Sequence, residues 1–130
     1  MPDVEPTMND PKNDPRLVEA FQLMWGNFPD PMMLVHKDRT ILAVNDACAK
    51  QGAAVGTKCF SYNPVPGDVE HGACKACQAN KALKAGCAVA CDGEFAGGQL
   101  IRGYWIPVKG SSEVYLHGYS PLKPTLPAAA

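Results

Sequence analysis

Apolar residues recur every three or four positions between residues 17 and 28, which is the spacing of one face of an α-helix. Asp14 stands before this stretch as a candidate N-cap, and Pro15 suits the first helical position. Gly26 and Pro29 break the pattern at its far end. The sequence therefore predicts an N-terminal helix over residues 15–28, with an apolar stripe formed by Leu17, Ala20, Phe21, Met24, Trp25 and Phe28.

From residue 31 the apolar residues come in short runs separated by polar or glycine-rich breaks, a pattern typical of β-strands. The first two runs flank a polar break and predict a β-hairpin, after which Asn45 or Asp46 caps a short helix. A second helix, rich in alanine and lysine, is closed by Gly86. The predicted elements are strands over 32–36 and 40–44, a helix over 74–85, and strands over 87–95, 100–108 and 114–119.

This order predicts one α+β domain: a five-stranded antiparallel sheet with helices on one face, flanked by the N-terminal helix. A chain of 130 residues has room for one such domain and its core. Both ends are rich in proline and poor in residues that can be buried. We expect a disordered tail over residues 1–14, the domain over 15–120, and a Pro/Ala-rich tail over 121–130.

The charges nearly balance, since 12 Lys and Arg against 13 Asp and Glu leave a net charge of -1 at pH 7. So small a charge does not attract nucleic acid or an anionic membrane surface, and neither is an expected partner. The N-terminus has acidic residues and prolines where a signal peptide is basic and then apolar, and no apolar run approaches the length of a membrane span. We therefore expect a cytoplasmic protein with reduced cysteines.

Three of the six cysteines lie within residues 59–77, and two of them form a Cys-x-x-Cys pair at Cys74 and Cys77. Such a pair supplies two thiolates to a metal, and Cys59 is the candidate third ligand. His71 is the first candidate for the fourth ligand, and Cys87 or Cys91 could also complete the set. In this interpretation the site would bind zinc or an iron–sulfur cluster.

Two other interpretations of these cysteines stay open. If Cys74 begins the predicted helix, the helix N-terminus stabilises its thiolate, and Cys77 can resolve a reversible disulfide. Alternatively, the cysteines are buried as small hydrophobic residues, which also explains Cys48, Cys87 and Cys91 without chemistry. No nucleophile–base pair, phosphate-binding glycine loop or carboxylate pair stands out, so the sequence does not predict an enzyme.

The order of elements, together with several local motifs, resembles a PAS domain over residues 20–120. These motifs are the hairpin that runs into Asn45, the glycine-led segment 56–60, the helix end at 83–86 and the Trp-x-Pro strand at 104–108. Cys59-Phe60 and the Cys-x-x-Cys pair resemble the bacterial and archaeal PAS subgroup with a Cys-aromatic and a Cys-x-x-Cys at the start of the long helix. Ser120-Pro121 departs from the Asp-hydrophobic-Thr signature that often follows the last PAS strand.

The resemblance implies a non-catalytic sensory and signal-transduction domain that holds a small ligand or cofactor between its sheet and helices. It implies a homodimer through the N-terminal helix and an unknown signalling partner. The alternatives are a cysteine-based metal or thiol–disulfide sensor, and a dimerising interaction scaffold without a ligand. The candidate cavity residues are Leu34, Val44, Tyr104 and Trp105.

Overall fold

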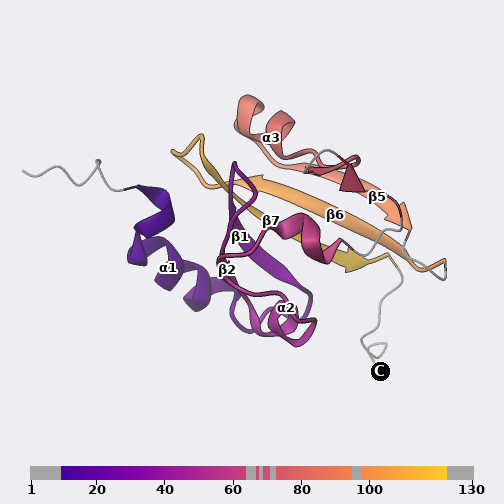
Figure 1. The fold of residues 1–130 in the computed structure, drawn as a ribbon, viewed down its shortest axis with the longest axis horizontal. Helices are drawn as coiled ribbons and strands as arrows, with labels where there is room; N and C mark the ends of the chain where they lie inside the picture. Colours follow the sequence, from indigo (N-terminus) through magenta and orange to yellow (C-terminus); the bar gives the residue numbers. More distant parts are fainter. Residues whose placement is uncertain (1–9, 64–66, 68, 71–72, 95–97, 123–130) are drawn as a thin grey trace, which may run out of the picture.

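The computed structural model describes residues 10–63, 67, 69–70, 73–94 and 98–122. Its centre is a five-stranded antiparallel sheet with the strand order β2-β1-β7-β6-β5 (Figure 1). The strands are β1 (Met32–His36), β2 (Ile41–Val44), β5 (Val89–Glu94), β6 (Leu100–Pro107) and β7 (Val114–Pro121). The predicted α+β fold with a five-stranded antiparallel sheet is confirmed.

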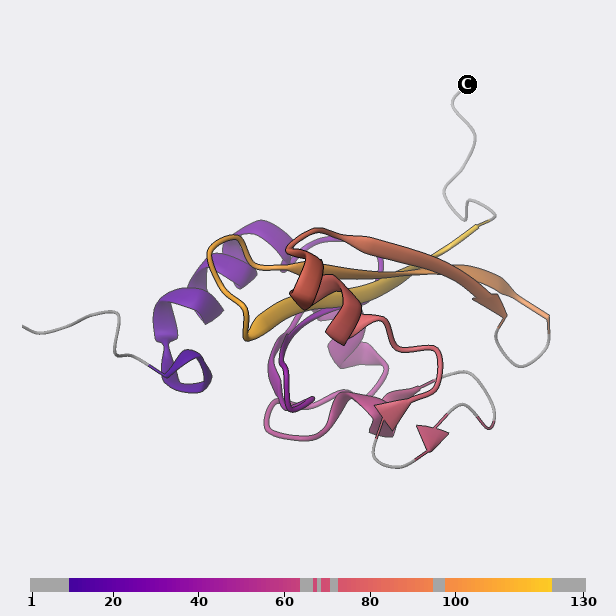
Figure 2. The ribbon, with the colours of Figure 1, turned by 90° about the horizontal axis from the view of Figure 1, so that it is seen from above.

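The remaining elements are short and surround this sheet. A separate two-stranded ribbon pairs β3 with β4, and Figure 2 shows α2, α3 and this ribbon on one side of strands β5 to β7. Their bounds are η2 (Pro11–Asn13), α1 (Pro15–Trp25), α2 (Asp46–Lys50), η3 (Cys59–Tyr62), β3 (Val69–Glu70), β4 (Ala73–Cys74) and α3 (Ala79–Ala85).

Strand register gives the sheet two different faces. Trp105 pairs with His117 across β6 and β7, and His117 pairs with Met33 on β1, so these side chains share one face. This inner face packs against α2 and α3, with a core that includes Val35, Ile41, Cys48, Ala79, Ala82 and Tyr115.

The opposite, outer face of the sheet has its own core, and α1 covers it. Phe21 of α1 is 4% exposed and packs with Leu34 of β1 and Val114 of β7. Leu17, Val18 and Trp25 pack around this cluster. The predicted flanking helix is therefore an integral layer of the domain.

Two predicted helix boundaries are wrong. The N-terminal helix ends at Trp25 rather than at residue 28, and a turn closed by the Phe28 N–H on the Trp25 carbonyl follows. The helix predicted from residue 74 begins at Ala79. Cys74 pairs with Val69 in the β3–β4 ribbon, and this pairing places its backbone in a strand rather than in a first helical turn.

Described residues on both sides of the predicted domain boundaries contact the domain. Asp10 caps η2, and Lys12 forms an ion pair with Asp38 in the β1–β2 turn, although residues 10–14 were expected in the tail. At the other end, the Leu122 N–H bonds to the Leu100 carbonyl at 3.1 Å. The rest of both predicted tails, 1–9 and 123–130, lies outside the described residues.

Candidate functional site

A cavity of about 190 Å³ lies between the inner face of the sheet and the segments that cross it. Its sheet wall comes from β1, β5, β6 and β7, and the opposite wall from α2, η3 and the segment around the Cys-x-x-Cys pair. Most of the lining is apolar. The lining residues used below are Met33, Arg39, Cys48, Cys59, Asn63, Cys74, Cys77, Cys91, Asp92, Gly93, Ile101, Gly103, Trp105, Tyr115 and His117.

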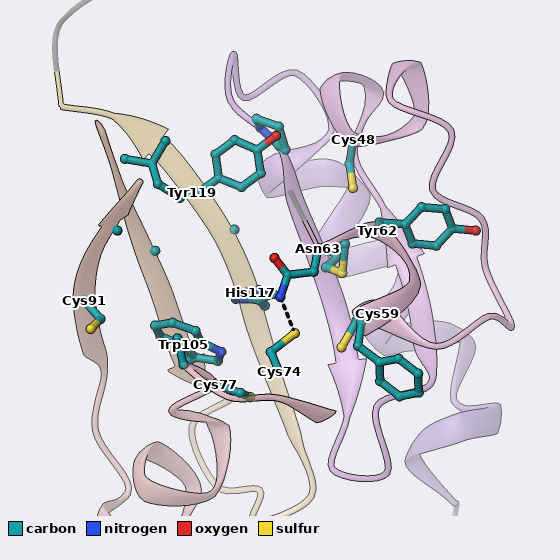
Figure 3. Close-up of a pocket in the computed structure, with 18 of the residues that line it drawn as sticks. Cys48, Cys59, Tyr62, Asn63, Cys74, Cys77, Cys91, Trp105, His117 and Tyr119 are labelled. Carbon is teal, nitrogen blue, oxygen red and sulfur yellow. Dashed lines mark hydrogen bonds between the residues drawn. The ribbon is translucent and has the colours of Figure 1, made fainter. Parts of the chain in front are cut away.

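Five of the six cysteines line this one cavity, and all six are free thiols. Figure 3 shows Cys91 on the sheet wall and Cys48 and Cys59 on the opposite side. Cys74 and Cys77 approach from the segment before α3. The sequence prediction brought together Cys59, Cys74 and Cys77 and assigned Cys48 to packing. It left Cys91 open between packing and a place in the metal site. The sixth thiol, Cys87, is exposed and is not part of the described lining.

Burial keeps the two most enclosed of these thiols protonated. It raises the pKa of Cys59 to about 12, to which the neighbouring Cys74 and Cys77 add, while Arg39 opposes the shift. Burial alone raises the pKa of Cys48 to about 11. Since the thiolate is the nucleophilic form, neither residue is an activated nucleophile at neutral pH.

The Cys-x-x-Cys pair does not have the helix-terminal environment that the sequence predicted. Cys74 lies in β4, and the Cys77 N–H closes a turn on the Cys74 carbonyl at 3.1 Å, two residues before α3 begins. Instead, the Asn63 side-chain amide donates a hydrogen bond to Cys74 Sγ at 2.9 Å (Figure 3). The argument that a helix dipole activates Cys74 therefore does not hold.

Trp105 and His117 form an aromatic wall on the sheet side. Their rings stack with centroids 4.9 Å apart and planes 21° apart. The tryptophan ring can lie this close to the sheet because Gly103 has no Cβ; a Cβ there would sit 3.3 Å from Trp105 Cη2. His117 Nδ1 is 2.9 Å from the Tyr104 carbonyl, which can only accept, so Nδ1 carries the proton.

Two buried polar atoms of the lining residues have no hydrogen-bond partner among the described residues: Tyr115 Oη and Arg39 Nε. The Cys59 thiol lies close to the Tyr115 hydroxyl, but not in hydrogen-bond geometry. Burial, with the adjacent Cys59, raises the pKa of Tyr115, so the phenol is neutral. A buried polar group without a hydrogen-bond partner lowers the stability of a fold by about 1–3 kcal/mol, so such groups are rare. Each one calls for an explanation, and a bound ligand that supplies the missing partner is one.

Arg39 reaches the cavity from the β1–β2 turn. Its φ of 78° lies in the left-handed region, and it is the one described non-glycine residue with a positive φ. The Cys59 N–H bonds to the Arg39 carbonyl at 2.9 Å, which ties this turn to η3. The Nη atoms of Arg39 donate hydrogen bonds to two neutral acceptors, the Lys37 carbonyl and Asn80 Oδ1.

Of the four predicted cavity residues, Trp105 lines the cavity and the other three are not in the described lining. Leu34 belongs to the outer core beneath α1, and Tyr104 faces away from Trp105 because neighbours in a strand alternate. Val44 packs at the edge of the inner core.

Within the described residues, no group of three or more His, Cys, Asp or Glu side chains has an arrangement that could hold a metal ion. Cys59, Cys74 and Cys77 share the cavity without forming such a group. The fourth predicted ligand, His71, lies outside the described residues. Zinc and iron–sulfur binding therefore stay predictions.

No protein-family model matches the sequence, and neither does any curated protein. Solved structures match the fold. A domain of an HTR-like protein from Haloarcula marismortui ATCC 43049 has a TM-score of 0.56 and 23% identity, over 73% of this chain and 99% of that one. The PAS domain of Bordetella pertussis BvgS has a TM-score of 0.57 and 14% identity, over 84% and 87%. This chain has the PAS fold.

A third PAS-fold neighbour is a sensory box sensor histidine kinase from Vibrio cholerae, with a TM-score of 0.57 and 11% identity over 92% of this chain and 100% of that one. At these identities the shared property is the fold. In the part of the chain that the structure describes, no helix is both long and apolar enough to cross a bilayer.

Proposed function

We propose that this PAS-fold chain is a non-catalytic sensory domain that binds a small ligand in its internal cavity. The observation that carries the proposal is the mostly apolar cavity with unpaired polar atoms in its lining, because few convergent polar groups in an apolar pocket are typical of ligand sites. Similarity to a sensor histidine kinase and to the BvgS PAS domain supports a role in signalling.

Cavity size restricts the ligand class. Drug-sized ligands occupy about 300–1,000 Å³, whereas a cavity of about 150 Å³ holds one benzene ring. At about 190 Å³ this cavity suits a ligand of roughly one ring rather than haem or flavin.

A blocking substitution tests the proposal. Gly93 lines the cavity, and a Cβ there meets nothing within 4 Å, so Gly93→Leu fills space without an initial clash. We expect it to abolish the binding of ring-sized compounds in ligand-observed NMR. Ala90→Leu is the matched control, since Ala90 is exposed on the same strand and faces the other way. Binding that survives Gly93→Leu would place the ligand elsewhere.

A thiol–disulfide switch is the second candidate, favoured by the five thiols around one cavity. Two thiols would each lose a proton and an electron to a peroxide, which is reduced to water and the corresponding alcohol or to water alone. Because burial raises the pKa of Cys59 to about 12, the attacking thiolate would come from the Cys-x-x-Cys pair and not from Cys59.

Mass spectrometry after mild oxidation tests the switch. We expect a disulfide that includes Cys74 or Cys77, lost in the Cys74→Ser and Cys77→Ser variants and kept in Cys87→Ser. Thiols that all stay free after oxidation would eliminate this candidate. The cytoplasmic location, the signalling partner and a ligand-free scaffold role stay predictions.

A further inference from the structure

Among the described residues, no carboxylate forms an ion pair with the positive charge that Arg39 brings to the cavity. The guanidinium of Arg39 is charged at physiological pH, and no described carboxylate forms an ion pair with it. Asp92 also lines the cavity, but it is paired with Arg102 at 2.7 Å.

The other ionisable groups around Arg39 do not supply a negative charge. Cys59 and Tyr115 stay protonated because burial raises the pKa of each. His117 stays neutral because burial lowers its pKa, and the charge of Arg39 adds to that shift. Within the described lining, which is mostly apolar, Arg39 is therefore the charged group that has no ion-pair partner.

The two unpaired atoms are both donors. Arg39 Nε has one N–H, and the Tyr115 hydroxyl can donate its proton. A carboxylate has two oxygens and one negative charge, so it can accept from both groups and balance the guanidinium. A dianion such as phosphate would bring an excess charge into surroundings that are mostly apolar.

We propose that the cavity binds a small monocarboxylic acid whose carboxylate accepts hydrogen bonds from Arg39 and Tyr115 and whose apolar body, about one ring in size, packs near Trp105. This inference rests on the proposed function, since it names the ligand class for the same cavity. The apolar body would contact Met33, Ile101 and the thiols on the walls.

Calorimetric titration of the full chain with benzoate and with benzamide tests whether binding requires a negative charge on the ligand. These probes share one ring and nearly the same shape, but only benzoate carries a carboxylate. We expect benzoate to bind about 10- to 100-fold more tightly, the factor that a hydrogen bond to a charged group supplies.

Two variants test the residues. We expect Arg39→Gln and Tyr115→Phe each to weaken benzoate binding by about 10-fold or more and to weaken benzamide binding less, because the amide oxygen of benzamide accepts hydrogen bonds but carries no charge. Arg16→Gln, in an exposed ion pair on α1, and Tyr104→Phe, on the outer face, are matched controls that should bind benzoate like the wild type. Tyr115→Phe also removes an unpaired buried hydroxyl, so its melting temperature without ligand should equal or exceed that of the wild type.

Equal Kd values for benzoate and benzamide, or benzoate binding that survives both substitutions, would overturn the inference. If benzamide binds and Gly93→Leu blocks it, the small-ligand proposal stands while the acid is excluded. If neither probe binds, the inference of an acid ligand fails. The proposed function is then tested separately by the NMR experiment with other ring-sized compounds and the Gly93→Leu variant.

Discussion

At the scale of single residues, Asn45 uses its whole side-chain amide to join three segments. Its Oδ1 accepts from the backbone N–H groups of Met32 and Cys48 at 3.0 and 2.9 Å. Its Nδ2 donates to the Asp30 and Phe28 carbonyls at 2.9 and 3.3 Å. The residue is fully buried, so none of these bonds has a ready replacement by water.

We predict that Asn45→Ala lowers the free energy of unfolding by about 2–4 kcal/mol, because several buried groups lose their partners. Asn45→Asp keeps the accepting oxygen but faces two carbonyls with a carboxylate, and it should also destabilise the fold. Urea unfolding measures both. The exposed Asn27→Ala should change little, and an Asn45→Asp variant as stable as the wild type would contradict the interpretation.

The partly buried His117 predicts a pH dependence. Burial lowers its pKa below the ordinary value of 6.5, so the unfolded chain takes up a proton at a higher pH than the folded protein does. Stability from this group is therefore complete above pH 6.5 and decreases as the pH falls through and below that value. Thermal unfolding between pH 7.5 and 5 should show a shallower loss in His117→Gln than in the wild type; parallel curves would exclude this role.

At the scale of elements, the apolar stripe of α1 divides into two parts. Phe21 is 4% exposed, whereas Leu23 and Met24 are 80% and 78% exposed. Phe21 and Trp25 are four residues apart and share the face that packs on the sheet. Met24 belonged to the predicted stripe but points away from this core.

We predict that Phe21→Ala lowers the free energy of unfolding by about 3–5 kcal/mol, since it leaves a cavity in the outer core. Met24→Ala should change it by less than about 0.5 kcal/mol. Denaturant titration at low protein concentration measures both values. An equal effect of the two substitutions would mean that α1 packs differently.

The boundaries of elements were the least predictable feature from sequence. Alanine and lysine favour a helix from residue 74, yet the pairing of Cys74 with Val69 of β3 prevents it. A strand of two residues is too short to leave an alternating pattern in the sequence. The capping residues were easier to predict, because Asp14 and Asn45 cap α1 and α2 through local hydrogen bonds. Asp14 was the predicted cap of α1, and Asn45 was one of the two candidates for α2.

At the scale of the whole molecule, the sheet and its strands were predictable because alternation and turns are local signals. Most residues that line the cavity were not predictable, because its walls come from segments whose proximity depends on strand register. The alternation along β7 does place Tyr115 and His117 on one face, and that signal was available in the sequence. Arg39 gave no signal, since it lies in a polar turn.

The predicted homodimer through the N-terminal helix stays a prediction, and the structure changes which residues it can use. Leu23 and Met24 are the large apolar residues of α1 that are exposed, whereas Phe21 packs within the domain. We predict that a Leu23→Ser, Met24→Ser double variant shifts the dimer toward monomer in light scattering with its melting temperature retained. Val55→Ser, at another exposed apolar residue, is the control, and a wild type that is monomeric at high concentration would exclude the dimer.

The grouping of five thiols around the cavity, with Cys87 outside it, provides a built-in record of occupancy. An alkylating reagent must share the cavity with any occupant to reach Cys74 and Cys77, whereas Cys87 and the exposed Cys91 react from solvent in either state. The ratio of labelled Cys74 and Cys77 to labelled Cys87 would therefore report the fraction of filled molecules, even inside a living cell and without knowledge of the ligand.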